Sequence, residues 1–113
     1  METLDIVKEI VLLLKEKKGE DIVVLELKGI TTITDYFIIV TGTSPPHLHS
    51  LAKEVIKKIK KEFKIVPLNS FNESNDPWIL IDYQDCILHI FMKEAREYYN
   101  LEELWFEARK INL

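Results

Sequence analysis

The segment 36–41 constrains the fold most, because its side chains are apolar along nearly its whole length. A strand with one wet face alternates apolar and polar residues, whereas a strand covered on both faces reads as a continuous apolar run. Ser44 and Pro45 follow shortly after, where the serine hydroxyl can cap a helix and proline fits the first helical position. The sequence therefore predicts a central strand that leads into a helix, with further layers on both faces.

Apolar residues at three- and four-residue spacing predict two longer helices. The first carries Leu4, Val7, Ile10, Val11 and Leu14, and the second carries Leu48, Leu51, Ala52, Val55, Ile56, Ile59 and Phe63. For the first helix, Thr3 is the expected cap and Gly19 the expected left-handed stop. Two shorter helices are predicted at 93–99 and 101–108, with Asn100 and Glu103 forming a capping box for the second.

Five strands are predicted between and after these helices, at 22–27, 36–41, 64–68, 78–83 and 86–91. The last two read as a hairpin around Gln84 and Asp85, which implies antiparallel pairing. The helix between the second and third strands suits a crossover to a parallel neighbour. We expect one α/β domain over residues 1–113, with a mixed five-stranded sheet flanked by helices in the order α-β-β-α-β-β-β-α.

The totals favour a globular chain of one domain. The 113 residues are 47% hydrophobic and 30% charged, which distinguishes them from a disordered chain. Cys86 is the single cysteine, so no intramolecular disulfide forms and a reducing cytoplasm fits. The acidic start does not resemble a signal peptide, and no apolar run approaches the roughly 20 residues of a membrane span. We expect a cytoplasmic protein that is not inserted in a membrane.

Charge is unevenly distributed along the chain. The net charge of −4 argues against a direct nucleic-acid substrate and is compatible with a basic protein partner. Residues 47–64 hold six lysines and two glutamates, which we expect to form a solvated face. Residues 71–107 hold nine acidic residues against Lys93 and Arg96, interleaved with large aromatics. This acidic and aromatic part is the stronger functional candidate.

The residues assemble no recognisable catalytic or metal site. His47 and His49 point in different directions near a helix start, and His89 stands alone in an apolar strand, so each is expected to be a hydrogen-bonded core or surface histidine. Cys86 is expected to be a small buried apolar residue. We therefore expect no catalytic residue, no metal and no cofactor.

Two weaker chemical readings concern phosphate and paired carboxylates. Residues 41–44 precede a helix and could bind a phosphate, but the spaced glycines and lysine of a P-loop are absent. Asp82 and Asp85 flank the hairpin turn and do not stand on one strand as Mg²⁺-binding carboxylates typically do. The sequence thus predicts a protein that is not an enzyme.

Besides Phe91, residues 78–106 hold six large aromatics, more than we expect one small core to absorb: Trp78, Tyr83, Tyr98, Tyr99, Trp105 and Phe106. Aromatic anchors with a charged rim are typical of binding surfaces. We expect Tyr83 and Trp105 in the core. For Trp78 and Tyr99, core and interface remain equally open.

Three segments resemble motifs of the ribosomal silencing factor family, also called the Iojap family. They are residues 35–44 (DYFIIVTGTS), 78–91 (WILIDYQDCILHIF) and 96–105 (REYYNLEELW), in the family's order and separation. The resemblance implies a nucleotidyltransferase-like α/β fold without known catalysis, often as a homodimer. It also implies binding to ribosomal protein L-fourteen on the large ribosomal subunit, where the bound protein would block joining of the small subunit and repress translation.

Carried over residue by residue, the resemblance places a partner-binding set at or near the ribosomal contact: Trp78, Asp82, Tyr98, Tyr99, Leu101 and Glu102. The chain departs from the family at Gln84, where a glycine is usual, at Phe71 and Asn72 in the preceding loop, and at Pro45 and Pro46. Two alternatives stay open. One is a divergent nucleotidyltransferase-like protein that binds nucleotide near 41–44, and the other is a dimeric module that serves an unrelated basic protein.

Overall fold

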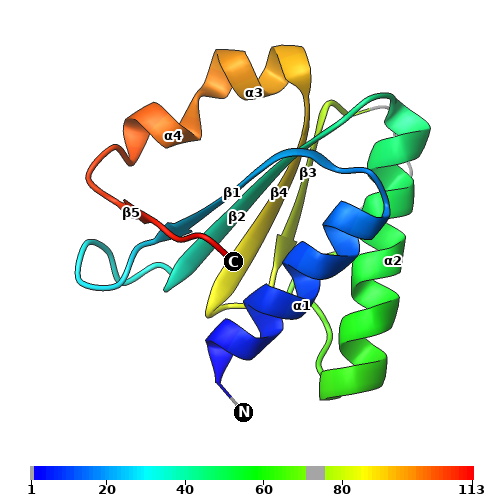
Figure 1. The fold of residues 1–113 in the computed structure, drawn as a ribbon, viewed down its shortest axis with the longest axis horizontal. Helices are drawn as coiled ribbons and strands as arrows, with labels where there is room; N and C mark the ends of the chain where they lie inside the picture. Colours follow the sequence, from blue (N-terminus) through cyan, green and yellow to red (C-terminus); the bar gives the residue numbers. More distant parts are fainter. Residues whose placement is uncertain (1, 71–75) are drawn as a thin grey trace.

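The computed structural model describes residues 2–70 and 76–113, so the expectation for Phe71 and Asn72 lies outside the described residues. Its centre is a mixed sheet of five strands in the order β3-β4-β2-β1-β5 (Figure 1). The strands are β1 Glu20–Glu26, β2 Tyr36–Gly42, β3 Trp78–Asp82, β4 Cys86–Met92 and β5 Arg109–Lys110. β2 pairs with β4 in parallel and the other neighbours are antiparallel. The predicted fold class, the buried β2 and the β3–β4 hairpin are confirmed.

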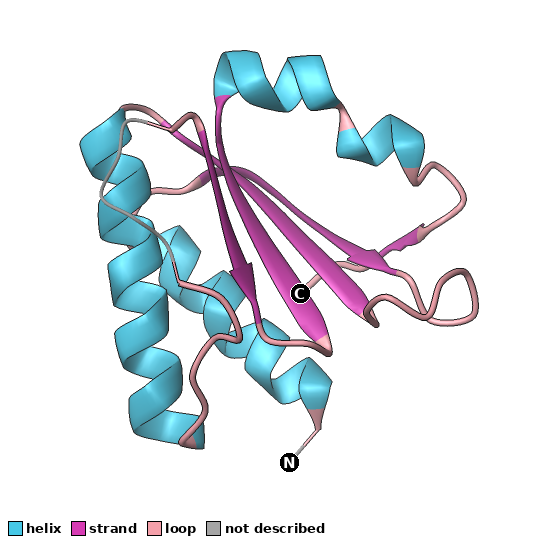
Figure 2. Cartoon of the chain, turned by 180° about the vertical axis from the view of Figure 1, so that it is seen from behind, coloured by secondary structure: helices cyan, strands magenta, loops and turns pink. Residues whose placement is uncertain are grey.

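Helices cover both faces of the sheet (Figures 1 and 2). The helices α1 Thr3–Glu16 and α2 Pro45–Phe63 pack on one face, over side chains such as Ile38 and Leu88. The short helices α3 Lys93–Tyr99 and α4 Leu101–Leu104 lie on the other face, over a smaller core that includes Phe37 and Phe91. Because β2 contributes to both cores, its continuous apolar run is explained.

The fifth strand is not the one predicted. Residues 64–68 form no strand, and β5 near the C-terminus completes the sheet instead. Pro67 has no N–H to donate to a ladder, and the Asn69 side chain occupies the edge of β3. Its Nδ2 donates to the Leu80 carbonyl at 2.7 Å, and its Oδ1 accepts from the Asp82 N–H at 2.8 Å. Together with the Leu68 N–H, which donates to the Asp82 carbonyl at 2.7 Å, this side-chain amide takes the place of a paired strand.

The ends of α1 also differ from expectation. The helix begins at Thr3 with Glu2 as its N-cap residue, and the Glu2 N–H donates to Asp5 Oδ2 at 3.3 Å. Lys18 takes the left-handed conformation with φ 65°, and Gly19 does not. Gly19 is needed for a close approach instead, because a Cβ there would lie 2.7 Å from Val40 Cγ2.

The helix α4 stops at Leu104, four residues before the predicted end. Asn100 also ends α3 in the left-handed conformation with φ 44°, so it lacks the extended backbone that an N-cap side chain requires. Its Nδ2 donates to Glu103 Oε2 at 2.6 Å, and the predicted capping box does not form. By contrast, the cap of α2 is confirmed: Ser44 Oγ accepts from the His47 N–H at 3.2 Å, with Pro45 as the first helical residue.

Candidate partner-binding surface

Three aromatic side chains gather where β3 begins and α3 ends. The Trp78 ring lies 4.7 Å from the Tyr99 ring, and Tyr99 meets Tyr98 edge-on at 5.1 Å, measured between ring centroids. Tyr98 is 82% exposed and Tyr99 is 48% exposed, whereas Trp78 is half-buried. We call Trp78, Tyr98 and Tyr99 the aromatic surface. Trp78 thus packs partly in the core and partly faces solvent, while its role and that of Tyr99 in an interface stay predictions.

The chain order of β3, β4 and α3 creates this surface. Trp78 opens β3 opposite Phe91, the penultimate residue of β4. Because α3 starts directly after β4, it crosses this end of the sheet and carries Tyr99 back over Trp78. Phe91 supports both rings, with its centroid 5.0 Å from Trp78 and 6.5 Å from Tyr99.

His89 lies beneath Trp78 in the core. The Trp78 Nε1–H donates to His89 Nδ1 at 3.1 Å, so the imidazole is neutral with its proton on Nε2. Burial lowers the pKa of His89 to about 4. The ring meets Phe37 edge-on at 4.5 Å, and its Nε2 has no hydrogen-bond partner. The expectation of a hydrogen-bonded core histidine is confirmed, and His89 fixes the orientation of the Trp78 indole.

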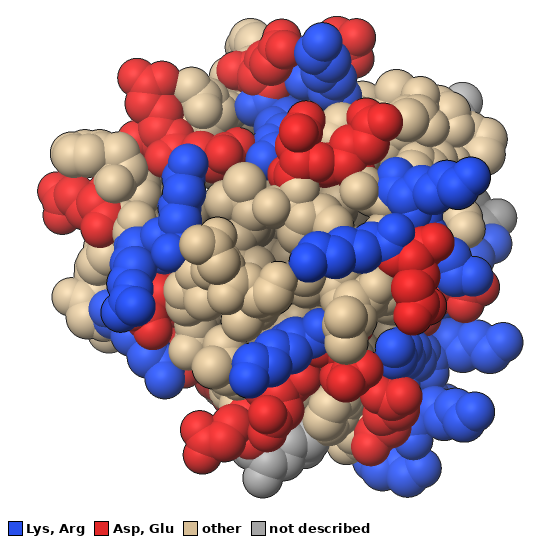
Figure 3. Space-filling view, viewed as in Figure 1, with Lys and Arg blue, Asp and Glu red and all other residues tan. Residues whose placement is uncertain are grey.

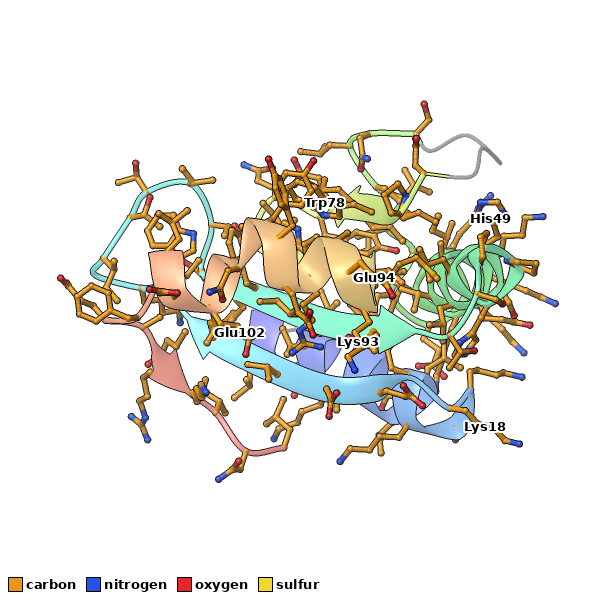
Figure 4. All side chains as sticks on the ribbon, turned by 90° about the horizontal axis from the view of Figure 1, so that it is seen from above. Lys18, His49, Trp78, Lys93, Glu94 and Glu102 are labelled. Atoms are coloured by element: carbon orange, nitrogen blue, oxygen red, sulfur yellow. The ribbon has the colours of Figure 1, made fainter. Side chains whose placement is uncertain are left out.

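Glu102 lies on the opposite side of α3 from Trp78, as the view down onto this helix shows (Figure 4). Glu102 Oε1 accepts from Arg96 Nε at 2.9 Å, and Arg96 Nη1 donates to Thr41 Oγ1 at 2.8 Å. These residues line a hollow of ≈530 Å³ together with Asp21 and Lys93, among others. In this arrangement Glu102 tethers α4 to α3 and through Arg96 to β2.

Leu101 and Asp82 make contacts other than the stacking of the aromatic rings. Leu101 is partly buried and packs on the core beneath α3 and α4. Asp82 ends β3, four residues beyond Trp78, which is about 13 Å along a strand. Its Oδ1 accepts from the Gln84 N–H at 2.7 Å, so it shapes the hairpin turn. The structure therefore brings together three of the six predicted residues.

Comparison with known proteins gives one clear family. The family of RsfS, described as ribosomal silencing factor during starvation, matches residues 1–113. The chain belongs to the ribosomal silencing factor family. It is 39% identical over 100 residues to the ribosomal silencing factor of Halalkalibacterium halodurans, a match that covers 87% of this chain and 83% of the relative. The family predicted from the three motifs is confirmed.

Two further relatives of this silencing-factor chain extend the comparison. A crystal structure of a protein from Chromobacterium violaceum superposes with a TM-score of 0.87 at 30% identity, covering all of this chain and 92% of that one. The mouse protein named mitochondrial assembly of ribosomal large subunit protein 1 is 33% identical over 98 residues, which span 85% of this chain and 43% of the mouse protein. Proteins of the family are named as silencing factors and not as enzymes.

One acidic residue near the aromatic surface, Glu94, is absent from the partner-binding set predicted from the sequence. Glu94 is exposed on α3, one turn before Tyr98. Residues four apart lie on the same side of a helix, so this spacing was a usable signal. Acidic side chains surround α3 and α4 in the space-filling view (Figure 3). A carboxylate therefore stands beside the most exposed ring.

The Cys86 thiol, expected from the sequence to be a small buried group, is buried in the structure. Burial, followed by the charges of Asp85 and Asp82, raises the pKa of the Cys86 thiol to about 12. Among residues 2–70 and 76–113, no group of three or more His, Cys, Asp or Glu is placed to hold a metal.

Two backbone N–H groups at the loop considered for phosphate binding already have hydrogen-bond partners. The Thr43 N–H donates to His47 Nδ1 at 3.0 Å, and the His47 N–H donates to Ser44. The other ring nitrogen of His47 then donates to the Lys17 carbonyl at 2.9 Å.

Within the described part of the chain, no helix is long and apolar enough to cross a membrane.

Proposed function

We propose that this silencing factor represses translation by binding ribosomal protein L-fourteen on the large ribosomal subunit through its aromatic surface. The observation that carries the proposal is the exposure of Tyr98 and Tyr99 over a partly buried Trp78. The bound protein then prevents the small subunit from joining by occupying space that the joined subunits require.

The energetics of protein interfaces support this role. Interface energy concentrates in a few aromatic anchors on a rigid base, surrounded by polar groups. Trp78 supplies the rigid base, because its indole is held by His89 below and Phe91 beside it. Glu94 supplies a carboxylate next to Tyr98, and carboxylates speed the encounter with a basic ribosomal protein.

Steric occupancy needs no chemistry from the chain. The molecule measures about 35 × 34 × 24 Å, which is large enough to separate two surfaces that must touch. The name of the mouse relative, which refers to assembly of the large subunit, supports a large-subunit partner. The proposal includes a cytoplasmic location, no cofactor, and a homodimer as the free form.

Calorimetric titration with purified ribosomal protein L-fourteen tests the contact. Replacing Tyr98 by lysine adds a positive charge beside Glu94 and removes a ring that contributes little to the fold, so the affinity should fall by at least about tenfold. Phe106→Lys is the matched control, since Phe106 is 76% exposed and lies off the aromatic surface. Equal affinity of the wild type and Tyr98→Lys would contradict the proposed surface.

A further inference from the structure

The lysines of α2 form a second charged feature that the proposed function does not use. At 100° per residue, Lys53, Lys57, Lys60, Lys61 and the following Lys64 fall within about 100° of arc. All five are exposed, and they extend over about 16 Å of the helix axis. We call these five residues the lysine stripe. In the space-filling view, lysine and arginine side chains gather along the edge over α2 (Figure 3).

The stripe lies opposite the buried side of α2. Leu48, Leu51, Val55 and Ile59 are fully buried, and their directions centre about 180° from the stripe. The two glutamates of the helix, Glu54 and Glu62, fall outside the arc of the lysines, and they line the groove between α1 and α2 together with Lys57, Lys58 and Lys61. Lys58 also lies off the stripe, where it pairs with Glu9 at 3.2 Å. The glutamates of α2 therefore lie to one side of the stripe, and no carboxylate of this helix stands within its arc.

We propose that the lysine stripe contacts the phosphate backbone of double-stranded ribosomal RNA beside the bound protein partner. A row of ammonium groups without an interleaved carboxylate matches a polyanion, and such contacts carry no sequence requirement. The overall negative charge argues against nucleic acid as the main ligand. It does not argue against a local contact that lysines make with RNA after the protein has docked. This inference rests on the proposed function, which brings the chain to a surface built largely of RNA.

The burial of α2 disfavours a membrane surface as the occupant. A helix that binds lipid headgroups inserts its apolar side into the bilayer interface. The apolar side of α2 packs against the sheet and α1, as the complete burial of Leu48, Leu51 and Val55 shows. The stripe therefore offers charge alone, which suits an RNA backbone.

The test measures binding of the full chain to a short RNA duplex by fluorescence anisotropy at two salt concentrations. Three contacted phosphates predict about a 40-fold loss of affinity between 50 and 200 mM salt. The variant Lys57→Gln, Lys60→Gln, Lys61→Gln should bind at least about tenfold more weakly at 50 mM salt and show less than half of that salt dependence. Glutamine is close to lysine in helix propensity, so thermal unfolding should be nearly unchanged.

A charge-matched control uses Lys8, Lys28 and Lys110, three exposed lysines outside the stripe, each replaced by glutamine. This control should bind RNA like the wild type. No salt-dependent RNA binding by the wild type, or equal losses in both triple variants, would overturn the inference.

Pelleting with large subunits separates this inference from the proposed function, because the duplex assay contains no ribosomal protein. The stripe variant should retain its affinity for isolated protein L-fourteen while binding whole large subunits more weakly. If it binds the RNA duplex normally and yet loses subunit binding, the stripe serves an acidic protein and the RNA assignment is wrong. If Tyr98→Lys leaves subunit binding intact while the stripe variant fails in the duplex assay, only the proposed docking surface is wrong.

Discussion

Gln84 shows how one residue departs from what its side chain prefers. Its φ of 72° lies in the left-handed region, which costs a residue with a Cβ about 1–2 kcal/mol. Asp82 holds the turn by accepting from the Gln84 N–H, and the Tyr83 N–H donates to the Cys86 carbonyl at 2.9 Å. The family's usual glycine at this position was the sequence signal that a positive φ is required.

Gln84→Gly is therefore expected to stabilise the protein by about 1 kcal/mol, because glycine adopts this conformation without strain. Chemical denaturation followed by tryptophan fluorescence measures the change. Gln84→Ala keeps the Cβ and serves as the control, with little change expected. A glycine variant that is less stable than the alanine variant would show that the turn carries no strain.

His89 should make the stability depend on pH. The unfolded chain has a histidine pKa near 6.5, whereas the folded chain has a pKa of about 4, so the unfolded state binds the proton more readily. The contribution is fully present above pH 6.5 and is lost as the pH falls from there towards 4. A loss of about 1 kcal/mol is expected between pH 7.5 and 5.5.

Denaturation of wild type and His89→Gln at both pH values isolates the histidine. Glutamine retains an acceptor for the Trp78 indole N–H, although it packs less well. The variant should be less stable at pH 7.5 and should lose most of the difference between the two pH values. An unchanged pH dependence in the variant would assign the effect to other groups.

Among the elements, the sequence was most informative where periodicity and caps agreed. The apolar residues at helical spacing in α2 and the Ser44 cap predicted that helix well. The apolar run of β2 predicted the central place of that strand. The edge strand of the sheet was harder to predict from the sequence, because β5 is two residues long and depends on pairing with β1. No local pattern distinguishes such a strand from a loop, and none indicates that Asn69 covers β3.

Asn69→Ala tests the covered edge. Losing both side-chain hydrogen bonds should destabilise the protein by about 1 kcal/mol, since water partly replaces them at this exposed position. Hydrogen exchange at the Asp82 amide should become faster, because that N–H donates to Asn69. Asn69→Asp retains an acceptor and should protect this amide better than alanine does. Equal exchange in wild type and alanine variant would mean that the edge is protected by something else.

At the scale of the whole molecule, the sequence indicated which aromatic residues belong to the candidate site but not how the structure arranges them. Three motifs identified the family, and three of the aromatic residues chosen from the sequence lie together in the structure, where their role in binding stays a prediction. Spacing alone did not reveal that α3 separates Glu102 from Trp78, because the direction in which α3 crosses the sheet is a tertiary property. It also did not reveal that the Trp78 indole N–H donates to His89, because these two residues lie on neighbouring strands.

The two proposals assign different partners to the two charged regions. The aromatic surface at α3 with its carboxylates is proposed to recognise a basic protein, and the lysine stripe on α2 is proposed to meet RNA. They lie on helices that cover opposite faces of the sheet (Figures 1 and 2). Steric silencing then follows from the volume of the domain that these contacts hold in place.

Sedimentation of large and small subunits with increasing amounts of the protein tests this account most directly. The wild type should travel with the large subunit and reduce the fraction of joined ribosomes, while Tyr98→Lys should do neither and Phe106→Lys should act like the wild type. Joined ribosomes that carry the wild-type protein in full occupancy would contradict silencing by occupancy.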